Sequence, residues 1–182
     1  LQDLQRTMRI VRSQADEYGV NPDQLGICGF SAGGHLCAML CTNYAQDSYP
    51  PTDRIDRVSA RPDFAMLIYP AYLTEPSTSN DVDPLLKNLK RNQTPPMFMA
   101  AARDDFVTRG MLNFYLDVRA ANIPAECHVY ESGGHGGGLD PGSYPASQWT
   151  QAAARWLKDM LPAEEAASPQ TAEENPESRP QD

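Results

Sequence analysis

Cysteine and histidine are scarce in this sequence, and neither is grouped. There are four cysteines and three histidines in 182 residues. No Cys-x-x-Cys pair and no cysteine–histidine cluster with the spacing of a metal site occurs. We therefore expect no metal and no cofactor. The favoured interpretation of Cys28, Cys37, Cys41 and Cys127 is that they are small, buried hydrophobic residues rather than ligands or disulfide partners.

Long apolar runs and basic clusters are missing as well. No apolar run approaches the length that a membrane-spanning helix needs, and the first nineteen residues are amphipathic and charged rather than typical of a secretory signal. The formal net charge is −9, and no patch of lysine and arginine interleaved with aromatic residues occurs. We therefore expect neither a nucleic acid nor a membrane as a partner.

Aromatic and large aliphatic residues are absent from the last part of the chain. Residues 162–182 contain six acidic residues and one arginine, so this segment carries −5 of the net charge of −9. Such a composition cannot bury enough apolar surface to offset the entropy lost on ordering. We expect a disordered, acidic, proline-rich tail at 162–182 that follows one folded domain at 1–161.

Apolar residues in the remaining chain repeat with the periods of strands and helices in alternation. Buried strands are predicted at about 25–30, 62–70, 96–102 and 125–131, and helices at about 2–18, 32–44, 108–121 and 149–160. This alternation is typical of an α/β fold in which a parallel sheet is flanked by helices on both faces. Ligands of such sheets bind at the carboxyl ends of the strands.

One short stretch after the first predicted strand indicates chemistry. Gly29-Phe30-Ser31-Ala32-Gly33 has the form G-x-S-x-G and lies between a strand and a helix, which is the setting of a nucleophile elbow. Side chains at Gly29 and Gly33 are expected to clash with the neighbouring helix and strand. The N-terminus of the helix places positive potential where a tetrahedral intermediate carries negative charge. Ser31 is therefore the candidate nucleophile.

A serine hydroxyl needs a base, and His135 is the histidine in the right place. It follows the fourth predicted strand in the glycine-rich loop "ESGGHGGG". His35 lies one turn into the helix after Ser31 and is expected to pack or to hydrogen-bond, whereas His128 lies inside a strand and is expected to be partly exposed there. The order serine, acid, histidine along the chain is the order of this fold.

Two neighbouring aspartates compete for the role of the acid that orients the base. Asp104 and Asp105 both follow the third predicted strand. We prefer Asp104, because Asp105 has the position of a residue that caps the next helix. Asp63, at the start of the second strand, is a weaker alternative.

These motifs resemble the α/β-hydrolase superfamily, and within it the acetylxylan esterase and feruloyl esterase-like members. The resemblance rests on "DLQRTMRIVRSQADEYGVNPDQLGICGFSAGGHL", "PMFMAAARDDFV" and "AECHVYESGGHGGGL", and it extends over residues 1–161. It implies a serine carboxylic-ester hydrolase with Ser31 as nucleophile, Asp104 as orienting acid and His135 as base. It also implies that the backbone N–H of Ala32 is an oxyanion donor and that a small or carbohydrate-linked ester, such as acetylated xylan, is the substrate.

One part of that pattern does not occur in the sequence. Similar enzymes take a second oxyanion donor from a His-Gly-Gly loop after an earlier strand, and no such loop is present. We therefore expect an N-terminally truncated domain that leaves the strand at 25–30 with an unpaired edge and that is weakly active or inactive alone. Two alternatives stay open: an amide or peptide hydrolase of the formamidase or oligopeptidase type, and a catalytically impaired fragment that acts as a binding module.

Overall fold

The computed structural model describes residues 1–76, 79–139 and 142–161; the predicted tail at 162–182 lies outside the described residues. Four strands form one parallel sheet in the order β1-β2-β3-β4. The strands are β1 (Gly26–Phe30), β2 (Phe64–Ile68), β3 (Met97–Ala102) and β4 (Ala125–Tyr130). Because the strands are parallel and follow chain order, all of their carboxyl ends lie at the same edge of the sheet.

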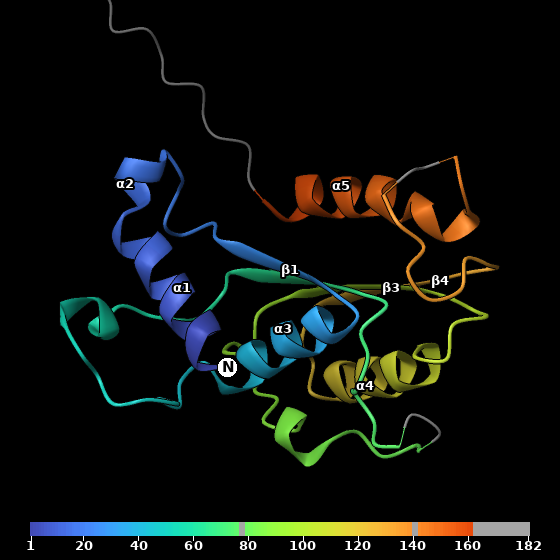
Figure 1. Cartoon of the computed structure of the whole chain (residues 1–182), viewed down its shortest axis with the longest axis horizontal. Helices are drawn as coiled ribbons and strands as arrows, with labels where there is room; N and C mark the ends of the chain where they lie inside the picture. Colours follow the sequence, from blue (N-terminus) through green and yellow to red (C-terminus); the bar gives the residue numbers. More distant parts are fainter. Residues whose placement is uncertain (77–78, 140–141, 162–182) are drawn as a thin grey trace, which may run out of the picture.

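Helices cover both faces of the sheet (Figure 1). On one face, α1, α3 and α4 pack with the strands in a large apolar core, and on the other, α5 packs over Phe98 and its neighbours in a smaller one. The helices are α1 (Gln2–Ser13), α2 (Ala15–Tyr18), α3 (Ala32–Asn43), α4 (Thr108–Ala120) and α5 (Trp149–Met160). This arrangement confirms the predicted α/β fold.

The predicted helix over 2–18 is divided in two. The chain leaves helical geometry at Gln14, between α1 and α2, and α2 ends at Gly19, which adopts a left-handed backbone with φ of 64°. Glycine tolerates this conformation without a steric penalty, so the predicted stop at Gly19 is confirmed.

The long connection between α3 and β2 is held to α1 by ion pairs. It contains a short 3₁₀ helix, η1 (Arg54–Arg57), where the buried Asp56 side chain lies 2.9 Å from Arg6. The carboxylate of Asp56 also accepts hydrogen bonds from the backbone N–H of Thr52 and the hydroxyl of Tyr49. The bond from the N–H of Thr52, which is the largest cause, and the bond from Tyr49, which is the next, hold the pKa of Asp56 well below its usual range.

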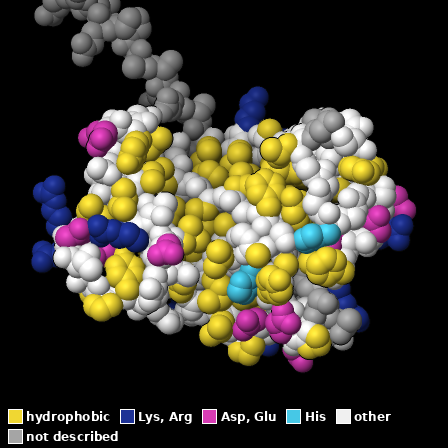
Figure 2. Space-filling model, in the orientation of Figure 1, with side chains coloured by type: hydrophobic (Ala, Val, Ile, Leu, Met, Phe, Trp, Pro, Cys, Tyr) yellow, Lys and Arg dark blue, Asp and Glu magenta, His cyan; other side chains and the backbone are white. Residues whose placement is uncertain are grey.

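Strand β1 is one of the two outer strands of the described sheet, and one of its faces is open. Along β1 exposed and buried residues alternate, whereas every residue of β3 is buried. The expectation that Cys28 is buried is therefore wrong, because α5 covers the neighbouring strands and not this part of β1. Cys37 and Cys41 are buried as expected, and Cys127 is half-buried. Hydrophobic side chains gather across the middle of the face that Figure 2 shows.

Candidate active site

Ser31 lies in the sharp turn between β1 and α3. Its backbone has φ of 52° and ψ of −120°, a region that non-glycine residues rarely adopt and that costs conformational energy. The turn is fixed on both sides: the N–H of Ser31 donates to the carbonyl of Ile68, and the carbonyl of Ser31 accepts from the N–H of Ala71, both at 3.0 Å. The strain is therefore held by the end of the adjacent strand, and the side chain of Ser31 stands at the carboxyl edge of the sheet.

The glycines of the motif are needed for packing, but not at both expected positions. A Cβ at Gly29 would lie 2.2 Å from the carbonyl oxygen of Gly33, so the expected clash is confirmed there. At Gly33 a Cβ would meet nothing within 4 Å, so that part of the expectation is wrong. The crowded position is Gly34, where a Cβ would lie 2.8 Å from the side chain of Pro70. The tight contact between α3 and the loop after β2 therefore depends on Gly34.

His135 connects Ser31 to a buried carboxylate. The Ser31 Oγ lies 2.7 Å from Nε2 of His135, and the other ring nitrogen, Nδ1, lies 3.0 and 3.1 Å from the two carboxylate oxygens of Asp105. An ionised carboxylate only accepts hydrogen bonds, so the ring carries its proton on Nδ1 and leaves Nε2 to accept from the serine hydroxyl. The Asp105 side chain is fully shielded from solvent, whereas that of His135 is 32% exposed.

The expectation that Asp104 orients His135 disagrees with the contacts in the structure, where Asp105 lies against that ring. Oδ1 of Asp104 accepts hydrogen bonds from the backbone N–H groups of Gly133 and Gly134, at 3.1 and 2.9 Å. Asp105 does not cap α4 as expected, because the N-cap residue is Val107 and α4 has no side-chain cap hydrogen bond. Instead, Oδ1 of Asp105 accepts from the N–H of Val107, and the same carboxylate reaches His135. The preference for Asp104 rested on that expected cap, and the described contacts place Asp105 rather than Asp104 against His135.

The loop that carries His135 is fastened at several points. Besides the two bonds to Asp104, the hydroxyl of Ser147 donates to the carbonyl of Gly137, and the indole N–H of Trp149 donates to the carbonyl of Gly138. Gly133 has φ of 153°, and a Cβ there would lie 2.5 Å from the side chain of Ala146. Backbone polar groups, rather than apolar burial, hold this loop in place.

Two aromatic rings border the imidazole of His135. The ring of Tyr69 meets it edge-on at 5.3 Å between centroids, and the ring of Phe106 lies 4.8 Å away. Burial, with a smaller contribution from the charge of Asp105, raises the pKa of Tyr69, which stays a neutral phenol at physiological pH. These rings restrict the orientations of the imidazole while leaving its Nε2 side toward Ser31 open.

The remaining sequence candidates lie away from this set of contacts or serve another purpose. His35 packs edge-on against Tyr72, and its buried Nε2 has no hydrogen-bond partner among the described residues. His128 is partly exposed in β4, as expected, and its Nε2 lies 2.6 Å from Glu126. Asp63 forms an ion pair with Arg12 at 2.7 Å and is not near His135 in any described contact.

Ala32 begins α3 directly after Ser31. The first N–H groups of a helix have no partner within the helix, so the N–H of Ala32 is available to a negatively charged oxygen beside Ser31. The dipole of this twelve-residue helix adds positive potential at the same point.

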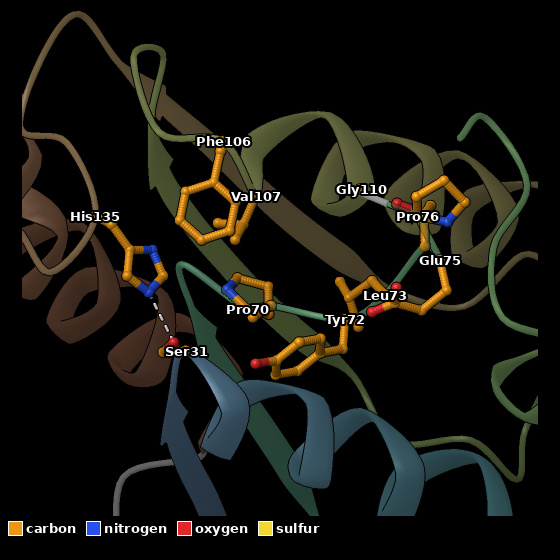
Figure 3. A pocket seen from close by; sticks show the side chains of 12 residues that line it. Ser31, Pro70, Tyr72, Leu73, Glu75, Pro76, Phe106, Val107, Gly110 and His135 are labelled. Carbon is orange, nitrogen blue, oxygen red and sulfur yellow. Dashed lines mark hydrogen bonds between the residues drawn. The ribbon is translucent and has the colours of Figure 1, made fainter. Parts of the chain in front are cut away.

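A cavity of about 340 Å³ opens beside Ser31 and His135 (Figure 3). Its near walls are Pro70, Phe106 and Val107, and it continues over the loop after β2 toward the first turn of α4. Among the described residues, no group of three or more His, Cys, Asp or Glu side chains could hold a metal ion. No helix in the described part of the chain has both the length and the apolar character of a membrane span.

The sheet, the elbow at Ser31 and the layered helices define the α/β-hydrolase fold. The crystal structure of an acetyl ester-xyloside bifunctional hydrolase from Caldicellulosiruptor lactoaceticus superimposes with a TM-score of 0.75 at 28% identity, over 87% of this chain and 64% of that one. A thermophilic esterase from Thermogutta terrifontis gives a TM-score of 0.68 at 26% identity, over 87% of this chain and 64% of that one.

Within that fold the chain resembles acetylxylan esterases. A family model described as BD-FAE matches residues 1–62. An acetylxylan esterase from Xylanibacter ruminicola is 30% identical over an alignment of 188 residues, and this alignment covers 90% of this chain and 36% of that protein. An endo-1,4-beta-xylanase B from Butyrivibrio fibrisolvens is 32% identical over 75% of this chain and 24% of that protein. The chain thus spans about a third or less of the length of these two curated relatives.

Proposed function

We propose that this chain carries the catalytic residues of a serine esterase that removes acetyl or similar small acyl groups from a carbohydrate, such as acetylated xylan. The observation that carries the proposal is the continuous hydrogen-bonded path from Ser31 through His135 to Asp105. The resemblance to an acetylxylan esterase and to an acetyl ester-xyloside hydrolase supports the choice of substrate.

In the proposed reaction, Ser31 attacks the ester carbonyl while Nε2 of His135 takes the hydroxyl proton. Asp105 keeps the ring in the required tautomer and stabilises the imidazolium that forms. His135 then gives the proton to the departing alcohol, and water, activated by the same histidine, hydrolyses the acyl-serine. The N–H of Ala32 donates to the oxyanion in both steps.

Within the described residues, Ala32 is the donor that we assign to the oxyanion. Each missing oxyanion donor costs about 3–4 kcal/mol, which is about 10²–10³ in rate. We therefore expect residues 1–182 alone to hydrolyse esters slowly.

The test is labelling of the purified chain with a fluorophosphonate, combined with hydrolysis of p-nitrophenyl acetate, acetylated xylan and a peptide anilide. We expect labelling at Ser31, loss of labelling in Ser31→Ala, and hydrolysis of the two esters but not of the anilide. Folded protein that neither labels nor hydrolyses would contradict the proposal and favour a binding module. Faster cleavage of the anilide than of the acetates would favour an amide hydrolase.

A further inference from the structure

The cavity beside Ser31 has two chemically different ends. Near Ser31 its walls are Pro70 and Phe106, whereas Glu75 and Pro76 lie at the far end (Figure 3). Thr74, which precedes Glu75 in the chain, also lines the cavity. Phe106, which lines this space, is 63% exposed. The difference between the ends indicates which part of a substrate enters.

Thr74 is a buried residue whose hydroxyl is not satisfied. The residue is 1% exposed, and its Oγ1 has no hydrogen-bond partner among the described residues. A buried hydroxyl without a partner destabilises the folded state, so such groups in a cavity lining are often completed by a ligand. Thr74 can donate one hydrogen bond and accept others, as a sugar hydroxyl can.

Gly110 places no side chain against that hydroxyl. It is a buried residue in the first turn of α4, where alanine would favour the helix more. A Cβ at Gly110 would lie 3.0 Å from Oγ1 of Thr74 and would narrow this end of the cavity. Glycine at this position therefore lowers the stability of the helix, but it avoids a close contact with the hydroxyl of Thr74.

Glu75 gives the same end of the cavity a negative charge. It is exposed at the rim, and its carboxylate accepts hydrogen bonds but donates none. Its charge, together with that of Asp83, opposes the lowering of the pKa of the neighbouring His35 by burial. A neutral ligand with adjacent hydroxyl groups matches a threonine and a carboxylate, whereas an anionic ligand is repelled.

We propose that Thr74 and Glu75 bind hydroxyl groups of the sugar ring that bears the ester, and that they select neutral, hydroxylated esters over plain and anionic ones. This inference rests on the proposed esterase function and deepens it by assigning the alcohol part of the substrate, rather than its acyl group, to the cavity.

The test compares kcat/KM for three acetates: a monoacetylated methyl xyloside, cyclohexyl acetate, and an acetylated methyl glucuronide that carries a carboxylate. Thr74→Val and Glu75→Gln each remove one hydrogen-bonding contribution, so we expect about a tenfold loss on the xyloside acetate and less than about a twofold change on cyclohexyl acetate. Glu75→Gln should also raise kcat/KM on the glucuronide acetate. Thr74→Ser keeps the hydroxyl and should retain the preference, and Glu17→Gln on α2 is the matched charge control. Equal losses on all three acetates, or unchanged ratios, would overturn the inference.

Binding is measured separately so that failure of the inference differs from failure of the proposed function. Saturation-transfer NMR with methyl β-xyloside and the Ser31→Ala chain needs no turnover. Weaker binding in Ser31→Ala/Thr74→Val than in Ser31→Ala supports the inference even if no ester is hydrolysed. Fluorophosphonate labelling and hydrolysis of both neutral acetates, with ratios that the Thr74 and Glu75 variants do not change, would leave the esterase function standing and reject the role of the cavity. Thr74→Val removes an unsatisfied buried hydroxyl, so it should fold at least as well as the parent chain, which thermal melting checks.

Discussion

Asp105→Asn should inactivate the chain far more than Asp104→Asn does, although the two residues are adjacent. In Asp105, Oδ1 accepts from the N–H of Val107 at 3.1 Å and also lies 3.1 Å from Nδ1 of His135, while Oδ2 is the nearer oxygen to that nitrogen, at 3.0 Å. An asparagine would keep its carbonyl oxygen on Val107 and turn its NH₂ group toward the ring. The ring would then carry its proton on Nε2 and could not accept the proton of Ser31.

The size of each effect follows from these contacts. Loss of the correct tautomer in a serine–histidine–aspartate site lowers kcat by about 10⁴, which corresponds to about 5.4 kcal/mol at 1.36 kcal/mol per tenfold change. In Asp104 one oxygen, Oδ1, accepts both N–H groups, so an asparagine carbonyl can keep both bonds and loses only their ionic reinforcement. That loss is about 1–2 kcal/mol for the loop, which corresponds to at most about thirtyfold in rate.

The assay is the second-order rate of fluorophosphonate labelling at Ser31, with hydrolysis of p-nitrophenyl acetate measured in parallel. Thermal melting of both variants serves as the control for folding. The reasoning is refuted if Asp104→Asn loses as much activity as Asp105→Asn, or if Asp105→Asn keeps more than a tenth of the parent rate while it remains folded.

Four further substitutions test the packing and the charge contacts of the fold. Gly29→Ala places a Cβ 2.2 Å from the carbonyl oxygen of Gly33 and should destabilise the chain by about 1–3 kcal/mol. The Cβ of Gly33→Ala meets nothing within 4 Å, so this change should alter the stability by less than about 1 kcal/mol. Urea unfolding measures both effects. Asp56 has a pKa in the folded state below its value in the unfolded chain, so it stabilises the fold above about pH 4 and loses that contribution as the pH falls further. Asp56→Asn should therefore lower the melting temperature at pH 7 and weaken the fall of the melting temperature in acid. An unchanged fall in acid would contradict this. Phe114→Ala empties a fully buried site in α4 and should cost about 3–5 kcal/mol by the same urea measurement, with a loss under about 1 kcal/mol counting against the packing described here.

Most of the fold follows from patterns that the sequence displays locally. The apolar run at Met97–Ala102 has every residue buried, as a strand covered on both faces requires, so its period and length predicted it directly. Exposure along β1 was harder to predict, because the open face of Cys28 depends on where α5 lies, and α5 is more than 100 residues away in sequence. Long-range placement, rather than local preference, decided that difference.

The same distinction explains the glycines of the elbow. The motif predicts that a turn must be tight, but it does not say which atoms approach which glycine. Gly29 faces the backbone of α3, and Gly34 faces Pro70, which follows β2 and lies some 36 residues further along the chain. The pattern G-x-S-x-G therefore identified one of the crowded positions, and the second belongs to a contact that only the folded sheet creates.

The choice between Asp104 and Asp105 depends on where β3 stops pairing. The N–H of Arg103 donates to the carbonyl of Tyr130 at 2.7 Å, which carries the pairing with β4 one residue beyond the strand end at Ala102. The turn follows only then, with the N–H of Asp105 bonded to the carbonyl of Ala102. This register directs Asp104 toward the backbone of the Gly133–Gly134 loop segment and Asp105 inward to His135. A shift of one residue in the end of the strand would exchange the two aspartates, and such an end is set by the partner strand, which the spacing within "ARDDFV" does not contain.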